Sequence, residues 1–258
     1  MTFEIVPGDA SSPYVIHVPH SSTRIPDDVR TQLLLDDDEL AEELRLMTDA
    51  RTDELAALAA RQVAPRPWLF VNHLSRLVVD PERLPDAHEE MYDVGMGAVY
   101  TRTSAGLALR DVDEDVEQLL LKRFFTPYAE ALADLIDQRI AACGYAVLVD
   151  LHSYPVQAQP YELHQEARRP PVCLGVDVDH TPATLRERAL RACSAIGEVV
   201  VNEPFAGSYI PLRHFGRDNR VSSVMVELRR DTYMRDAGTI DPDGARRVSD
   251  VLAAILEA

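Results

Sequence analysis

Three apolar segments of the chain end in side chains that could bind a metal ion or transfer a proton. YVIHVPHSS carries His20, YAVLVDLHS carries His152, and SSVMVELRR carries Glu227. Such runs are typical of buried strands, and in open α/β sheets ligands bind beyond the carboxyl ends of the strands. The three side chains can therefore converge although they lie far apart in the sequence. Two histidines and a carboxylate are a common donor set for catalytic zinc, with one position left for water.

Each of these residues taken alone has a plainer interpretation. A single histidine at a strand end is more often a hydrogen-bonded structural residue, and Glu227 could form an ion pair with Arg229. Glu227 nevertheless follows the apolar residues 224–226, and a carboxylate directly after a buried strand needs a compensating partner. The occurrence of all three together favours a functional site.

A further metal ligand has to come from another segment. The chain has no HExxH motif, and His20 is followed by two serines and a threonine, so it has no glutamate three residues away. The best candidate is Asp49 in MTDARTDEL, with Asp53 one helical turn later. Asp49 stands inside a helical pattern, where an aspartate is equally consistent with capping or interrupting the helix.

The segment SRLVVDPER contains a second group of charged residues: Arg76, Asp80, Glu82 and Arg83. Guanidinium groups hold carboxylates through paired hydrogen bonds, which favours an acidic substrate. A network of surface salt bridges among the same residues is the alternative.

The elements that must position these residues alternate between strands and helices. Short β-branched runs predict strands at residues 14–18, 68–72, 145–151, 172–178, 198–202, 208–215 and 222–228. Apolar residues at helical spacing predict helices at residues 36–63, 113–143, 182–196 and 241–258. This alternation predicts an α/β sandwich with a mixed, largely parallel sheet. Residues 80–111 lack periodicity, and so long a loop in a compact domain is often functional.

Composition sets the broad class of the protein. The chain has 258 residues, 46% of them hydrophobic, and no linker-like stretch divides it, so we expect a single domain over residues 1–258. A net charge of −17 argues against a nucleic-acid partner. No run approaches the roughly 20 apolar residues of a membrane span, and the N-terminus lacks the pattern of a signal peptide. Three widely spaced cysteines fit buried thiols in a reducing compartment, so we expect a cytoplasmic protein without a membrane partner.

With these segments assembled, the chain resembles the N-formylglutamate amidohydrolase family. The matching segments occur in family order from Tyr14 to Met234, and they are VPHSSTRIP, MTDARTDEL, SRLVVDPERLP, DLHSYP, NEPFAGSYIPLRHFG and VMVELRRDTYM. More distantly, HSY and VELRRDTY are similar to regions of zinc carboxypeptidases and aspartoacylases. The resemblance implies a phosphorylase/hydrolase-like fold, a three-layer α/β sandwich.

The resemblance also implies the chemistry of the site. His20, Asp49 and His152 would bind one Zn²⁺ or another divalent metal, and Glu227 would be the catalytic acid and base. Asp150, two residues before His152, would orient the site or balance its charge. The implied reaction is hydrolysis of the N-formyl, or another small N-acyl, amide of an amino acid such as N-formyl-L-glutamate.

Further residues are assigned to the substrate by the same resemblance. Arg83 matches the arginine that clamps a substrate carboxylate, with Arg76 assisting, and Arg213 or Tyr209 would donate to the oxyanion. The family motif DxNR reads DPER here, so Glu82 replaces an asparagine and adds a negative charge beside the clamp. We therefore expect the substrate to be a small amide that bears a carboxylate. The replacement of asparagine by Glu82 leaves the identity of its acyl group undetermined.

Two alternatives stay open at this stage. A zinc carboxypeptidase or N-acyl-amino-acid deacylase would use the same metal and base on a larger group. A non-catalytic relative would bind a small carboxylate, although Glu227 argues against it because binding alone needs no general base. His17 has the opposite side-chain parity to Ile16 and Val18, and we expect it to be structural.

Overall fold

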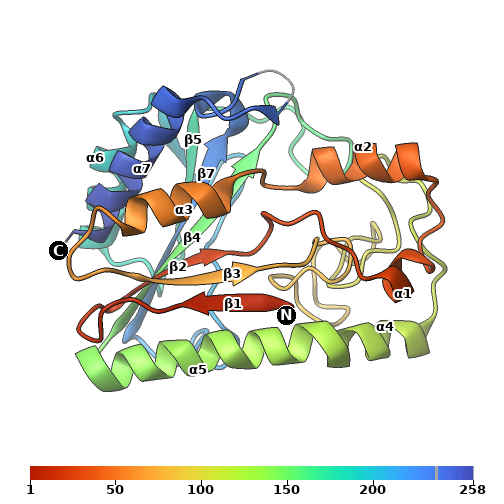
Figure 1. Cartoon of the computed structure of the whole chain (residues 1–258), viewed down its shortest axis with the longest axis horizontal. Coiled ribbons are helices and arrows are strands. Elements are labelled where there is room, and N and C mark those ends of the chain that lie inside the picture. Colours follow the sequence, from red (N-terminus) through yellow and green to blue (C-terminus); the bar gives the residue numbers. More distant parts are fainter. Residues whose placement is uncertain (236–237, 258) are drawn as a thin grey trace.

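A seven-stranded sheet forms the centre of the computed structural model, which describes residues 1–235 and 238–257 (Figure 1). The strands are β1 (Phe3–Val6), β2 (Tyr14–Val18), β3 (Trp68–Asn72), β4 (Ala146–Tyr154), β5 (Val172–Gly175), β6 (Val199–Val201) and β7 (Val221–Arg229). Their order in the sheet is β1-β3-β2-β4-β7-β5-β6. The β1–β3 and β5–β7 pairs are antiparallel and the other pairs are parallel. The predicted mixed, largely parallel sheet is confirmed.

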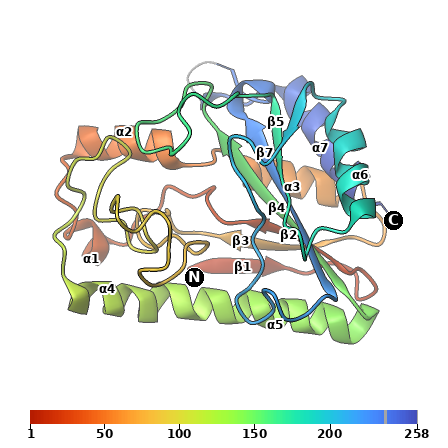
Figure 2. The same ribbon diagram turned by 180° about the vertical axis from the view of Figure 1, so that it is seen from behind.

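Helices cover both faces of this sheet. They are α1 (Asp27–Arg30), α2 (Asp37–Met47), α3 (Thr52–Ala60), α4 (Glu114–Leu120), α5 (Thr126–Cys143), α6 (Ala183–Cys193) and α7 (Pro242–Leu256). The apolar sides of α3, α6 and α7 pack on one face, and α5 packs on the other. Figures 1 and 2 show α5 along one side of the sheet, continued by α4. The predicted three-layer sandwich is confirmed.

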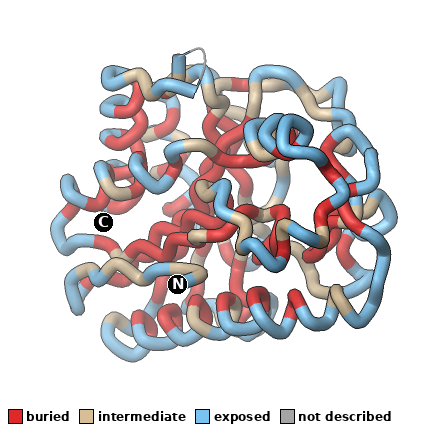
Figure 3. Tube along the Cα trace, turned by 45° about the vertical axis from the view of Figure 1, so that its right-hand side comes forward, coloured by how far each residue is buried: buried red, intermediate tan, exposed pale blue. Residues whose placement is uncertain are grey.

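The central strand β4 shows how the sheet positions polar residues. All nine of its residues are buried, and side chains alternate between the two faces. Val147, Val149 and Leu151 contact the α3–α7 layer, whereas Leu148 packs toward α5. Burying each such side chain stabilises the fold by about 1.5–3 kcal/mol. Asp150 and His152 share the parity of Leu148, so their side chains face the α5 side. Figure 3 shows that buried residues gather in the interior of the molecule.

Local signals fix several helix ends. Asp36 and Glu39 form a reciprocal capping box at the start of α2. Gly144 ends α5 in the left-handed conformation with φ of 85°, which glycine adopts without strain. Asp241 caps α7 by accepting a hydrogen bond from the backbone N–H of Gly244.

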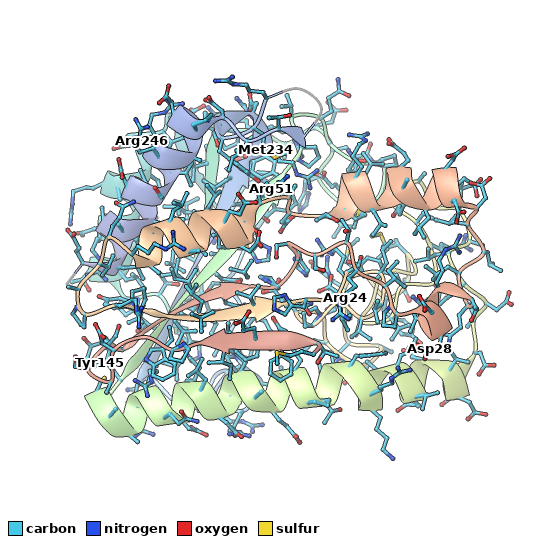
Figure 4. All side chains as sticks on the ribbon, viewed as in Figure 1. Arg24, Asp28, Arg51, Tyr145, Met234 and Arg246 are labelled. Carbon is cyan, nitrogen blue, oxygen red and sulfur yellow. The ribbon has the colours of Figure 1, made fainter. Side chains whose placement is uncertain are left out.

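The predicted helix over residues 36–63 is wrong in its middle. α2 ends at Met47 and α3 begins at Thr52, and Arg51 between them adopts a left-handed conformation with φ of 68° (Figure 4). The backbone N–H of Asp49 donates instead to the carbonyl of His20 over 2.9 Å. This contact with the segment after β2 competes with the helical pattern and places Asp49 beside His20.

Three other predictions need correction. Residues 208–211 are irregular and residues 212–215 form a turn, so no strand is present there, and Pro211 lacks the N–H that a sheet ladder uses. A π-helical turn at Leu121–Phe125 interrupts the predicted helix over 113–143, just before Pro127. The strand predicted at 172–178 ends at Gly175. The last helix ends at Leu256, and Ala258 lies outside the described residues.

The long loop 80–111 folds beyond the strand ends, between α2 and α4 (Figure 2). Met96, Tyr100 and Leu109 of this loop form a small core with Leu40 and Met47 of α2. Among the described residues, no helix is both long enough and apolar enough to cross a membrane. The single domain stays a prediction, supported by the one sheet that contains strands from both halves of the chain.

Candidate active site

Three of the predicted ligands point at one another in the buried interior. His152 Nδ1 lies 3.1 Å from Asp49 Oδ2 and 3.3 Å from His20 Nδ1, and the third distance, from His20 Nδ1 to Asp49 Oδ2, is 3.6 Å. All three residues are buried. His152 lies on β4, Asp49 lies in the break between α2 and α3, and His20 lies two residues after the end of β2. The structure therefore brings together side chains that lie up to 132 positions apart.

A carboxylate lies beside the far nitrogen of each imidazole. His20 Nε2 lies 2.9 Å from Asp80 Oδ1, and His152 Nε2 lies 3.1 Å from Asp150 Oδ2. A carboxylate beside one ring nitrogen favours a proton there and leaves the other nitrogen as a free donor for a metal. Both Nδ1 atoms are thereby prepared to face the same point.

The spacing of these atoms fits a metal ion. Bonds of about 2.1 Å in a tetrahedral site place neighbouring ligand atoms about 3.4 Å apart, and the three distances here lie on either side of that value. Burial raises the pKa of Asp49, but hydrogen bonds from His152 and His20 outweigh it and hold the pKa below its ordinary value. Asp49 is therefore a carboxylate at neutral pH, as a ligand must be.

Glu227 lies beside this cluster on the neighbouring strand. It is aligned with His152 across the parallel pair β4–β7, so both side chains lie on the α5 face near the carboxyl ends of these strands. Its Oε2 atom is buried and has no hydrogen-bond partner among the described residues. Burial, only partly opposed by His152, raises the pKa of Glu227 to about 8. A carboxyl group with this pKa can both accept and donate a proton near neutral pH.

A cavity of about 330 Å³ opens onto the cluster. In the described part of the chain, six carboxylates line it, those of Asp49, Asp80, Glu82, Glu90, Glu162 and Glu227. Three guanidinium groups also line it, those of Arg76, Arg83 and Arg230. The cavity thus has a strongly negative lining with a few fixed positive groups, which favours cations and can orient an anion only at the arginines.

The two arginines predicted to bind substrate are fixed by protein carboxylates. Arg76 donates to Asp80 Oδ2 from Nη2 over 2.6 Å and from Nε over 3.1 Å, and it is also bonded to the hydroxyl of Tyr100. Arg83 donates from Nη1 to Glu89 Oε1 over 3.0 Å. Both side chains line the cavity, and each has guanidinium N–H groups that these bonds do not use. Binding of the substrate carboxylate by Arg76 and Arg83 therefore stays a prediction.

Arg213 and Tyr209 lie elsewhere. Arg213 is half-exposed and pairs with Asp134 and Asp137 of α5, each over 2.7 Å, outside the cavity. The structure therefore corrects its assignment as an oxyanion donor, because the turn at 212–215 directs it to the surface. Tyr209 is packed against His17, with ring centroids 5.2 Å apart, and does not line the described cavity. Its assignment as a donor to the substrate has no support from its position.

Two residues in the site were missed from the sequence. Glu82 turns inward, with Oε2 3.2 Å from His152 Nε2 and Oε1 3.4 Å from His17 Nδ1. His17 Nδ1 also lies 2.9 Å from Asp150 Oδ1. The signal was present: Asp80 and Glu82 follow the apolar LVV run as a D-x-E pair, and His17 has the parity that faces α5. Asp150 lies between the two histidines, which supports its predicted orienting role.

Comparison with known proteins gives consistent matches. The family model for N-formylglutamate amidohydrolase matches residues 12–234. A relative from Pseudomonas aeruginosa, named N-formylglutamate deformylase, is 29% identical over 237 residues, which cover 86% of this chain and 82% of the relative.

Two solved structures share the fold. A crystal structure of N-formylglutamate amidohydrolase from Ralstonia eutropha superimposes with a TM-score of 0.80 at 22% identity, covering 99% of this chain and 96% of the other. A gene product of Agrobacterium tumefaciens superimposes with a TM-score of 0.72 at 19% identity, covering 99% and 94%. Because the family model spans most of its length, the chain belongs to the N-formylglutamate amidohydrolase family, which confirms the predicted family and class of enzyme, a hydrolase of amide bonds.

Proposed function

We propose that this protein is a metal-dependent amidohydrolase that removes a formyl or other small acyl group from the nitrogen of an amino acid such as N-formyl-L-glutamate. The observation that carries the proposal is the convergence of His20 Nδ1, His152 Nδ1 and Asp49 Oδ2 in one cavity with Glu227. The name of the Pseudomonas relative, a deformylase of N-formylglutamate, supports the substrate class.

His20, Asp49 and His152 would hold a divalent ion such as Zn²⁺, since two imidazoles and a carboxylate suit that metal. The ion supplies Lewis acidity, which acidifies water and polarises a carbonyl oxygen. The residues of the chain keep the donors in place: Asp80 holds the ring of His20, and Asp150 lies beside His152 Nε2.

Glu227 would carry the proton of the reaction. Its buried Oε2 has no partner among the described residues, so it can accept a proton from the attacking water without first breaking a bond. The same proton then passes to the amide nitrogen as the C–N bond breaks, which gives formate and a free amine. A pKa displaced toward the working pH serves both halves of this transfer.

Arg83 and Arg76 would orient the substrate through its carboxylate. Their guanidinium groups are anchored by Glu89 and Asp80, so little side-chain freedom is lost when an anion binds. In a cavity lined mainly by carboxylates, these are the sites where a negative group is stabilised.

The test is a screen for acid release by the zinc-loaded protein. N-formyl-L-glutamate, N-acetyl-L-glutamate, an N-formyl neutral amino acid and a short peptide with a free C-terminus are compared at equal concentration. Formate release from N-formyl-L-glutamate at the highest kcat/KM supports the proposal. Preference for the acetyl compound or for the peptide would identify a deacylase or a carboxypeptidase instead. Binding of these compounds with no turnover of any would contradict an enzymatic role.

A further inference from the structure

A second group of donor atoms converges on the far side of His152. His17 Nδ1 lies 2.9 Å from Asp150 Oδ1 and 3.4 Å from Glu82 Oε1. His152 Nε2 lies 3.1 Å from Asp150 Oδ2 and 3.2 Å from Glu82 Oε2. Glu82 and Asp150 thus each direct one oxygen to His17 and the other to His152, next to the first cluster.

We propose that His17, Glu82 and Asp150 bind a second divalent metal ion. Mixed imidazole and carboxylate donors suit Zn²⁺, Mn²⁺ and similar ions. The three residues offer ligand atoms that all lie within 4.8 Å of one another, which one ion can span. The site goes beyond the proposed function and shares with it Asp150, whose other oxygen lies beside His152 Nε2.

The hydrogen bonds of this group do not satisfy its atoms. Glu82 Oε1 and His152 Nε2 are buried, and neither has a hydrogen-bond partner within the described ranges. His152 is 5% exposed, so bulk water does not compensate its Nε2. A single proton on His17 Nδ1 is directed to Asp150 and cannot also serve Glu82. Unpaired buried polar atoms cost free energy, and a cation bound by His17, Asp150 and Glu82 would give Glu82 Oε1 a partner.

The remaining nitrogen of His17 is prepared for either state of the site. Its Nε2 lies 2.6 Å from the hydroxyl of Tyr128. A phenol hydroxyl can donate or accept, so it bonds the bare Nε2 when Nδ1 carries the proton. When Nδ1 binds an ion, Nε2 carries the proton and donates it to Tyr128, the arrangement that metal-bound histidines usually have.

The charge of the cavity also favours a second cation. Six carboxylates and three guanidinium groups of the described residues line it, and Asp150 adds a carboxylate directly behind His152. With Glu227 protonated, the other carboxylates ionised and all histidines neutral, these groups stay net negative after one divalent ion binds. The remaining negative charge attracts a second cation.

The decisive measurement is the number of metal ions bound per chain. Metal is removed with a chelator, the protein is titrated with Zn²⁺, and bound zinc is counted by elemental analysis after gel filtration. Parallel titration with Co²⁺ is followed by visible absorption, which reports each site independently of activity. Two ions per chain with two spectral phases are expected.

One variant and its control assign the second ion. Glu82→Gln keeps the volume of the side chain and should bind one ion, whereas Glu90→Gln, also in the cavity wall but outside both clusters, should bind two. One ion per wild-type chain at saturating Zn²⁺ overturns the second site and leaves the first intact. No bound ion overturns both sites, and two ions retained in folded Glu82→Gln overturn the assignment to Glu82.

Discussion

The Nδ1 atoms of His20 and His152 lie 3.3 Å apart and face each other across the carboxylate of Asp49. Two imidazole nitrogens at this distance repel each other unless a proton or a cation lies between them. Because Asp80 and Asp150 lie beside the opposite ring nitrogens, a metal ion shared by the two Nδ1 atoms satisfies every donor at once. This relationship is the basis of the metal centre in the proposed function.

Glu227→Gln should separate metal binding from turnover. The amide keeps the size of the side chain but cannot take up a proton, so kcat should fall by roughly 10²–10⁴-fold. Bound zinc per chain should match the wild type, because Glu227 is not among the three ligands. Steady-state formate release and elemental analysis measure the two quantities, and a fully active variant would remove Glu227 from the mechanism.

Asp80→Asn should weaken the metal centre without removing a ligand. Loss of the carboxylate beside His20 Nε2 frees the imidazole to rotate, and such changes typically lower metal affinity by about 10–100-fold. Competition with a chromophoric chelator gives the dissociation constant for Zn²⁺. Asp86→Asn, an exposed aspartate of the same loop, is the matched control and should leave affinity unchanged. Equal affinities in both variants would show that Asp80 does not position His20.

Arg83→Lys should raise KM for a substrate that bears a carboxylate. Lysine keeps the charge but loses the planar pair of donors, so we expect KM to rise by roughly 10-fold or more with a smaller change in kcat. Arg213→Lys is the matched control, because Arg213 pairs with Asp134 and Asp137 on the surface. This control should show wild-type kinetics, and a rise in KM in Arg213→Lys similar to that in Arg83→Lys would reinstate Arg213 in the site.

The metal-free protein should lose stability as the pH rises through the range in which Glu227 titrates. Its pKa is raised from 4.5 to about 8 by burial, so between these values the folded state binds more protons than the unfolded state. The free energy of unfolding therefore falls as pH increases from about 5 to about 8. Glu227→Gln removes this dependence and should be more stable than wild type at pH 9 by about 1–4 kcal/mol.

Chemical denaturation of the two metal-free proteins at pH 5 and pH 9 measures this difference. If the difference in the free energy of unfolding between the variant and the wild type is the same at both pH values, Glu227 titrates at its ordinary pKa.

Much of the site followed from local sequence patterns. The apolar runs before His152 and Glu227 fixed both as strand residues, and alternation within β4 placed Asp150 on the same face as His152. Carboxyl ends of parallel strands meet at one edge of a sheet, so convergence of these side chains could be expected.

The rest depended on contacts between distant segments. A helical pattern runs through Asp49, and only the hydrogen bond from its N–H to the carbonyl of His20 shows that the helix breaks there. Glu82 was predicted to lie beside the substrate clamp, yet it turns toward His17 and His152, a direction that its D-x-E spacing from Asp80 does not fix by itself. Arg213 was misplaced because β-branched and aromatic residues at 208–215 resemble a strand, whereas the segment is irregular and ends in a turn.

The most direct test of the account is the zinc content of His152→Ala compared with His164→Ala. His152 belongs to the ligand cluster, whereas His164 lines the same cavity without belonging to it, so both variants lose one imidazole from the same region. After equilibration with Zn²⁺ and gel filtration, elemental analysis should find wild-type zinc in His164→Ala and at least one ion fewer per chain in His152→Ala. Full zinc content in a folded His152→Ala protein would contradict the metal centre on which the proposed function depends.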